Sequence, residues 1–111
     1  MLGCLFIPTA AHATYYKAVG LISQYDGDGK KGADEITLSK RSCATDMKRE
    51  IPAANTLIYV KDSTNGKSLN FYKQDVGHFP SGVVLDLTYS GWAKFGHPAS
   101  LGRFSGEYFH S

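Results

Sequence analysis

Two aspartates, Asp75 and Asp86, flank a short loop that contains glycine and proline. Asp75 follows an aromatic stretch at residues 68–73, and Asp86 lies inside the apolar run VVLDL at residues 83–87. An acid inside an apolar run is costly unless it is hydrogen-bonded or faces a cleft. For Asp86 we leave two interpretations open, a bond to backbone amides of the next helix and a place in a cleft. For Asp75 we favour a functional role.

Histidine and cysteine are not spaced for metal binding. The histidines at positions 12, 78, 97 and 110 do not stand at metal-ligand spacing with one another or with a cysteine. The turn that starts at Asp26 has Lys30 and Thr37 where a calcium-binding EF-hand loop needs acidic ligands. We therefore predict no metal and no cofactor. His78 is a candidate for the cleft of Asp75, with an ordinary surface residue as the alternative.

Short strands must position these side chains. β-branched and aromatic residues alternate with turn formers, which is typical of strands. The pattern predicts strands at residues 15–22, 36–38, 56–61, 68–73, 83–87 and 103–109. Residues 39–50 are polar, and we expect them to be irregular. Five or six short strands indicate a small all-β barrel or sandwich, and periodicity does not choose between them.

Two local signals are stronger. Asn65-Gly66 between two strand-like runs predicts a two-residue hairpin turn with positive φ at both positions. Thr88 is placed to cap a short helix over residues 89–95, which Gly96 would end.

Composition and the first residues favour an exported single domain. The chain has 111 residues and a net charge of +2, which is too small to favour nucleic acid. Residues 2–7 are apolar and Ala11-His12-Ala13 matches an A-x-A cleavage site, so we expect residues 1–13 to be a signal peptide and residues 14–111 the mature domain. The alternative for these first 13 residues is a buried first strand of the domain. Cleavage would leave Cys43 without Cys4, and no stretch is long enough to span a bilayer.

Several motifs, in order, resemble the double-psi β-barrel of the rare lipoprotein A family and of the first domain of expansins. The shared pattern is a strand ending in aspartate, a Gly/Pro loop, a Gly-x-x-x-Asp-Leu-Ser/Thr strand and a short helix that closes on glycine. The matching stretches are Asp75, Gly77-His78-Phe79-Pro80, Gly82 to Asp86-Leu87-Thr88, Trp92 to Gly96, Ile51-Pro52, Asn65-Gly66-Lys67-Ser68 and Ala13-Thr14-Tyr15-Tyr16. The resemblance implies a six-stranded double-psi β-barrel with one or two short helices.

The chain departs from the rare lipoprotein A motif at one position that matters for catalysis. Rare lipoprotein A proteins usually carry Thr-Ala-Ala-His before the Leu-Pro pair, and the matching residues here are Thr45-Asp46-Met47-Lys48. Lys48 therefore stands where those proteins have histidine. Their glutamate near the first loop corresponds to Glu35, with Asp34 as a rival.

The resemblance implies a secreted, periplasmic or cell-wall-associated monomer whose partner is a glycan, either peptidoglycan or a cellulose-like polysaccharide. In a lytic transglycosylase-like enzyme, Asp75 would be the general acid, Asp86 would orient it or bind a sugar hydroxyl, and Glu35 would assist. The expected sugar-contacting side chains are Tyr15, Tyr16, Tyr72, His78 and Trp92. A glycan-binding module without catalysis and a secreted protease or glycanase inhibitor remain the alternatives, and Lys48 favours them.

Overall fold

The computed structural model describes residues 15–111, so the expected signal peptide and Cys4 lie outside the described residues. The described part contains six strands and three short helices. The elements are β1 (Tyr16–Tyr25), η2 (Ala33–Glu35), β2 (Ser42–Asp46), β3 (Leu57–Asp62), β4 (Ser68–Gly77), β5 (Val83–Thr88), α1 (Tyr89–Ala93), η3 (Ala99–Leu101) and β6 (Arg103–His110).

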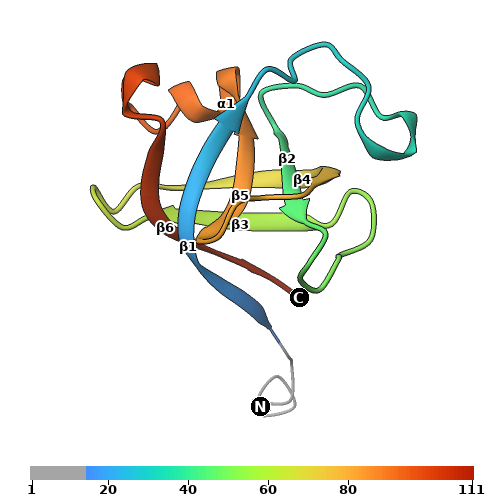
Figure 1. The fold of residues 1–111 in the computed structure, drawn as a ribbon, viewed down its shortest axis with the longest axis horizontal. Coiled ribbons are helices and arrows are strands. Elements are labelled where there is room, and N and C mark those ends of the chain that lie inside the picture. Colours follow the sequence, from blue (N-terminus) through green and yellow to red (C-terminus); the bar gives the residue numbers. More distant parts are fainter. Residues whose placement is uncertain (1–14) are drawn as a thin grey trace, which may run out of the picture.

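The six strands form a closed barrel in the order β1-β5-β2-β4-β3-β6 (Figure 1). Two of the neighbouring pairs, β1 with β5 and β2 with β4, are parallel, and the other four are antiparallel. The parallel pairs join strands that are far apart in the chain. Closure of the sheet decides for a barrel and against a sandwich, and it confirms the predicted all-β class.

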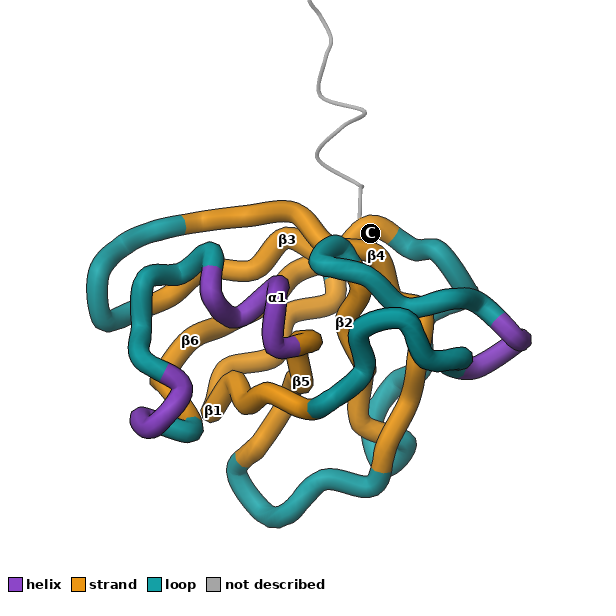
Figure 2. Tube along the Cα trace, turned by 90° about the horizontal axis from the view of Figure 1, so that it is seen from above, coloured by secondary structure: helices purple, strands orange, loops and turns teal. Residues whose placement is uncertain are grey.

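Helix α1 lies over one end of the barrel and closes it, as the view from above shows (Figure 2). Thr88 caps the helix as predicted, because its Oγ1 accepts a hydrogen bond of 3.1 Å from the Gly91 N–H. Trp92 and the following Phe95 are 2% and 1% exposed and belong to the same core cluster as the strand residues. Trp92 was expected to stack on sugar, and this expectation was wrong because its ring faces are covered by the core.

Strand β2 was not predicted. Residues 39–50 were expected to be irregular, yet all of Ser42–Asp46 forms a strand in which every residue is buried. Its polar side chains led to the expectation of an irregular segment. The Ser42 hydroxyl donates to Gln74 Oε1 on β4 at 2.5 Å, whereas the buried Thr45 Oγ1 has no hydrogen-bond partner. The strand expected at residues 36–38 is reduced to one isolated bridge between Lys31 and Thr37.

The β3–β4 hairpin is present, but its turn differs from the expected one. The Asp62 N–H bonds the Lys67 carbonyl, so residues 63–66 form the turn. Only Gly66 has positive φ, at +79°, and the expected positive φ of Asn65 was wrong. The Asn65 side chain instead accepts from the Lys67 N–H and donates to the Phe95 carbonyl, which ties the hairpin to the end of α1.

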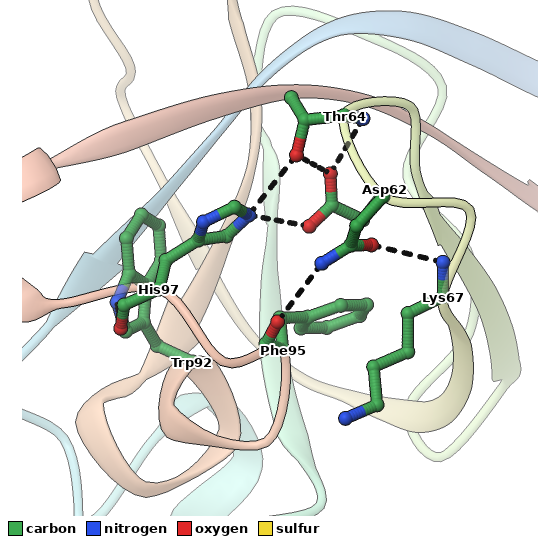
Figure 3. A network of polar contacts seen from close by, with 7 residues as sticks. Asp62, Thr64, Lys67, Trp92, Phe95 and His97 are labelled. Carbon is green, nitrogen blue, oxygen red and sulfur yellow. Dashed lines mark hydrogen bonds and ion pairs between the residues drawn. The ribbon is translucent and has the colours of Figure 1, made fainter.

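A buried acid strengthens the same junction (Figure 3). Asp62 has no exposed surface, and its carboxylate accepts from His97 Nε2 at 2.6 Å and from the Thr64 hydroxyl and N–H at 2.6 and 2.8 Å. Trp92 Nε1 donates to the His97 carbonyl at 3.2 Å. These bonds hold the hairpin against the segment that follows α1. Across residues 15–111, no helix has the length and apolar character needed to cross a membrane.

Replacing His97 should therefore destabilise the barrel. His97→Ala would leave the Asp62 carboxylate buried without its strongest partner, so we expect the free energy of unfolding to fall by about 3 kcal/mol. His78 is exposed and provides the matched control, because His78→Ala should change stability by less than about 0.5 kcal/mol. Urea unfolding followed by circular dichroism measures both. Equal effects of the two substitutions would contradict a stabilising role for this network.

Candidate functional site

The barrel registers place the two aspartates in one row across neighbouring strands. Asp75 on β4 faces Ala44 on β2, and Ala44 faces Asp86 on β5. The row continues from Asp86 to Ser23 on β1 and from Ser23 to Arg103 on β6. Their chain neighbours in β1 and β5 fill the core, so the row lies on the outer face of the barrel.

Ala44 separates the two acids. Neighbouring strands lie about 4.8 Å apart, so the backbones of Asp75 and Asp86 are roughly 9.6 Å apart across β2. Ala44 is 3% exposed and projects only a methyl group between them. The row therefore has a partly buried carboxylate on each side of a buried methyl group.

Asp75 is surrounded by hydrogen-bond donors. Its carboxylate accepts from the Tyr25 hydroxyl at 3.0 Å, from the Ala33 N–H at 3.1 Å and from the Val76 N–H at 3.0 Å. Donors to a carboxylate stabilise its charged form. Burial, followed by the charge of Asp75, raises the pKa of Tyr25, so this phenol stays protonated and donates. Strand β4 continues to Gly77, so Asp75 lies within the strand and not at its end as expected.

Asp86 has a different environment. Its carboxylate accepts one hydrogen bond, of 2.5 Å, from the Ser23 hydroxyl. Burial raises the pKa of Asp86, the negative charge of Asp75 raises it further, and the Ser23 bond and Arg103 oppose this shift. Asp86 therefore holds its proton to higher pH than an ordinary aspartate does. Of the two interpretations left open for it, the bond to helix amides is replaced by the bond to Ser23.

Glu35 lies near the row only through its segment. It is exposed, has φ of +61°, and belongs to η2, whose Ala33 N–H bonds Asp75. His78 is exposed in the loop after β4, and among residues 15–111 no hydrogen bond joins it to either aspartate. Tyr72 is half-buried on β4, opposite Ser42 and Leu57, three residues before Asp75.

The two N-terminal tyrosines lie elsewhere. Tyr15 is 74% exposed and borders a pocket of about 510 Å³ at the beginning of β1. Tyr16 stacks on His110 with 5.2 Å between the ring centroids. Ser23 is the member of the aspartate row on β1. At about 3.3 Å per residue of strand, it lies roughly 26 Å from Tyr15. Tyr15 and Tyr16 therefore do not share a site with the aspartates.

Sequence analysis missed three members of the site: Ser23, Tyr25 and Ala44. Their roles depend on pairing between strands that are distant in the chain, and residue type alone does not indicate such pairing. Within the described part of the chain, no group of three or more histidine, cysteine, aspartate or glutamate side chains could hold a metal ion.

The raised pKa of Asp86 leads to a prediction about stability. The folded protein keeps this proton to higher pH than the unfolded chain, so stability is lost as the pH rises from the ordinary value of 3.8 through the raised pKa. Asp86→Asn removes the charge and keeps an acceptor for Ser23. We expect its melting temperature to exceed the parent's by a few degrees at neutral pH, with a smaller difference in acid.

Differential scanning calorimetry across the acidic and neutral range measures this effect. Asp26→Asn is the control, because Asp26 is exposed and should show no such pH-dependent gain. A melting temperature of Asp86→Asn below the parent's at neutral pH would show that the charge of Asp86 stabilises the fold.

Comparisons with known proteins agree on this architecture. No protein-family model matches the chain. Streptomyces papain inhibitor superposes with a TM-score of 0.65 at 19% identity, over 86% of this chain and 93% of the inhibitor. The expansin of Clavibacter michiganensis superposes with a TM-score of 0.69 at 17% identity, over 86% of this chain and 50% of the expansin. A mutant of that expansin, in complex with cellohexaose, gives 0.69 at 14% identity with the same coverage.

These structures confirm the expected expansin-like double-psi β-barrel, and the chain spans half of the expansin's length. In sequence, the chain is 36% identical over 91 residues to the uncharacterized protein YdjM of Bacillus subtilis (strain 168), with 80% of this chain and 72% of YdjM covered. The chain therefore belongs to the same protein family as YdjM, with the fold of a double-psi β-barrel.

Proposed function

We propose that this domain acts on a cell-wall polysaccharide, which binds across the row formed by Asp75, Ala44 and Asp86. The observation that carries the proposal is the contrast between two carboxylates in one row. Asp75 accepts hydrogen bonds from three donors, whereas burial, and after it the charge of Asp75, raises the pKa of Asp86. A pair of acids with opposed environments is the arrangement that glycoside cleavage needs.

In the reaction that we propose, Asp86 and not Asp75 is the general acid. Asp86 donates its proton to the glycosidic oxygen while the bond from that oxygen to the anomeric carbon breaks and an oxocarbenium-like state develops. The 6-hydroxyl of the same sugar then attacks the anomeric carbon. Its proton passes to Asp75, the charged member of the pair, so that protons and bonds balance.

The comparisons support a glycan ligand and leave an alternative. The expansin mutant was crystallised with cellohexaose, and the same barrel in this chain carries the aspartate row. The papain inhibitor matches over 93% of its own length, so inhibition of a protease by a loop such as residues 77–82 is the second candidate function. We propose further that residues 1–13 direct export and are removed, which N-terminal sequencing of secreted protein tests.

Substitution of either acid tests the proposed reaction. We expect Asp86→Asn to lower the rate of glycan cleavage by about 10²–10⁴-fold, the usual contribution of general acid catalysis, while the fold is kept. Asp75→Asn should also lower the rate, because the attacking hydroxyl loses its base. Mass spectrometry of anhydro-sugar products from purified peptidoglycan measures both variants, and Asp26→Asn is the control.

The alternatives give different results in the same experiment. A domain that only binds glycan would release no product, and Asp86→Asn would change its affinity by about one hydrogen bond, on the order of 1 kcal/mol. An inhibitor would bind no glycan, would lower the activity of a papain-like protease, and would be insensitive to both substitutions.

A further inference from the structure

Aromatic and aliphatic side chains gather on the outer side of three neighbouring strands, β1, β6 and β3. Tyr59 on β3 pairs with Phe109 on β6, which in turn pairs with Lys17 on β1. The ring centroids of Tyr59 and Phe109 are 6.0 Å apart. Leu57 is two residues before Tyr59 and points to the same side, and Tyr15 borders the same pocket. We call Tyr15, Leu57, Tyr59 and Phe109 the aromatic face.

The aromatic face is open to a ligand. Tyr15, Leu57 and Tyr59 are 74%, 48% and 44% exposed. The pocket here has a volume of about 510 Å³, and its lining residues are Tyr15, Leu57, Tyr59, Phe109, His110 and Ser111. Exposed apolar side chains that gather around a hollow mark an interaction site. The reaction proposed above does not use this pocket, because Tyr15 lies roughly 26 Å from Ser23 of the aspartate row.

The side chains of this pocket offer a ligand no unpaired charge. Among residues 15–111, the lining includes no aspartate, glutamate, lysine or arginine. The His110 side chain is 4% exposed, and its Nε2 lies 2.9 Å from a carboxylate oxygen of Glu50. Lys17 Nζ lies 5.5 Å from the centroid of the Phe109 ring and 3.5 Å from a carboxylate oxygen of Glu107. The pocket therefore suits an uncharged ligand.

The chemistry of the aromatic face fits the ring of a sugar. A pyranose ring has a face of C–H groups and a rim of hydroxyl groups. Tyr15 and Tyr59 have a matching surface, because each presents an apolar ring with a hydroxyl group at its tip. Leu57 adds aliphatic surface to the same pocket. An uncharged ligand with apolar faces and polar edges can therefore satisfy all of these side chains at once.

The size of the aromatic face favours a few sugar rings over a protein partner. A stable protein interface takes about 20–30 residues from each side. This pocket has six lining residues. Two positions beyond Phe109 and Tyr59, the strands carry Glu107 and Lys61, which face each other in register. Charged residues are depleted from the centres of protein interfaces, so this pair limits how far an apolar interface could extend.

We propose that the aromatic face is a second glycan-binding surface, which stacks on uncharged sugar residues and does no chemistry on them. The proposal rests on the proposed function for its class of ligand and adds a site that the proposed reaction does not use. Because a polysaccharide repeats, the protein can hold one segment at the aromatic face while another lies at the aspartates. Two contacts with one polymer raise the apparent affinity without any new interaction at either site.

Nuclear magnetic resonance of the unaltered, ¹⁵N-labelled protein tests the location. The probes are cellohexaose and the hexamer of N-acetylglucosamine, which are both uncharged. We expect at least one of them to shift the amide signals of Tyr59 and Phe109 in a saturable manner. Shifts confined to the row of Asp75, Ala44 and Asp86, or no shift with either probe, would overturn the second surface.

Substitutions give an independent test. Tyr15→Ala and Tyr59→Ala should each weaken binding of the hexamer about 5-fold, since each removes one stacking ring. Tyr59→Phe should retain most of the affinity, because it keeps the ring. The matched control is Tyr89→Ala, since Tyr89 on α1 is 52% exposed and lies outside the aromatic face. Asp86→Asn should leave this binding unchanged, and melting temperatures identify any variant that is affected through its fold.

The outcomes separate this proposal from the proposed function. Binding that Tyr15→Ala and Tyr59→Ala weaken, and that Tyr89→Ala and Asp86→Asn keep, supports the aromatic face, even if no glycan is cleaved and the proposed reaction is wrong. Cleavage that depends on Asp86 without any binding at the aromatic face overturns the second surface alone. Failure to bind or cleave any glycan overturns both. A molecular mass by light scattering that is twice the chain's, and that Tyr59→Ala halves, would show that a second copy covers the face and would also overturn the proposal.

Discussion

The candidate site depends on the two parallel pairings that close the barrel. They place β5 beside β1 and β4 beside β2, and only this arrangement brings Ser23, Ala44, Asp75 and Asp86 into one row. Both pairings contain a register shift next to the row, between Leu21 and Ile22 on β1 and between Cys43 and Ala44 on β2. An extra residue in one strand of a pair redirects the side chains that follow it. The irregularities therefore help to turn the row outward while the flanking residues remain in the core.

The row shows how one fold gives two equal side chains different chemistry. Asp75 and Asp86 differ in their hydrogen-bond donors. A phenol and two backbone amides donate to Asp75, whereas a single serine hydroxyl donates to Asp86, whose pKa burial raises. Burial raises the pKa of Asp86, and the negative charge of Asp75 nearby raises it further. A buried acid with a raised pKa weakens the fold at neutral pH, and such a cost is typical of residues kept for function.

Sequence predicted those parts of the structure that local chemistry determines. The strands at β3, β5 and β6, the cap at Thr88 and the hairpin at Gly66 follow from side-chain type and spacing. It did not predict β2, because burial of polar residues such as Ser42 depends on partners supplied by another strand. It identified both aspartates but not the donors around Asp75, since Tyr25 and Ala33 lie about forty to fifty residues upstream. Trp92 was misjudged because the helix packs inward over the barrel end.

Lys48 stands where rare lipoprotein A proteins have histidine, and the two side chains differ in their ability to transfer a proton. An imidazole can exchange a proton near neutral pH, whereas an ammonium is a fixed charge that binds but does not catalyse proton transfer there. In the reaction that we propose, Asp86 and Asp75 supply both protonation roles within the row. Lys48 and Arg49 instead each lie 3.7 Å from a carboxylate oxygen of the buried Asp46 at the end of β2. The departure from the rare lipoprotein A pattern at Lys48 is therefore compatible with the proposed reaction, because that reaction needs no proton from this position.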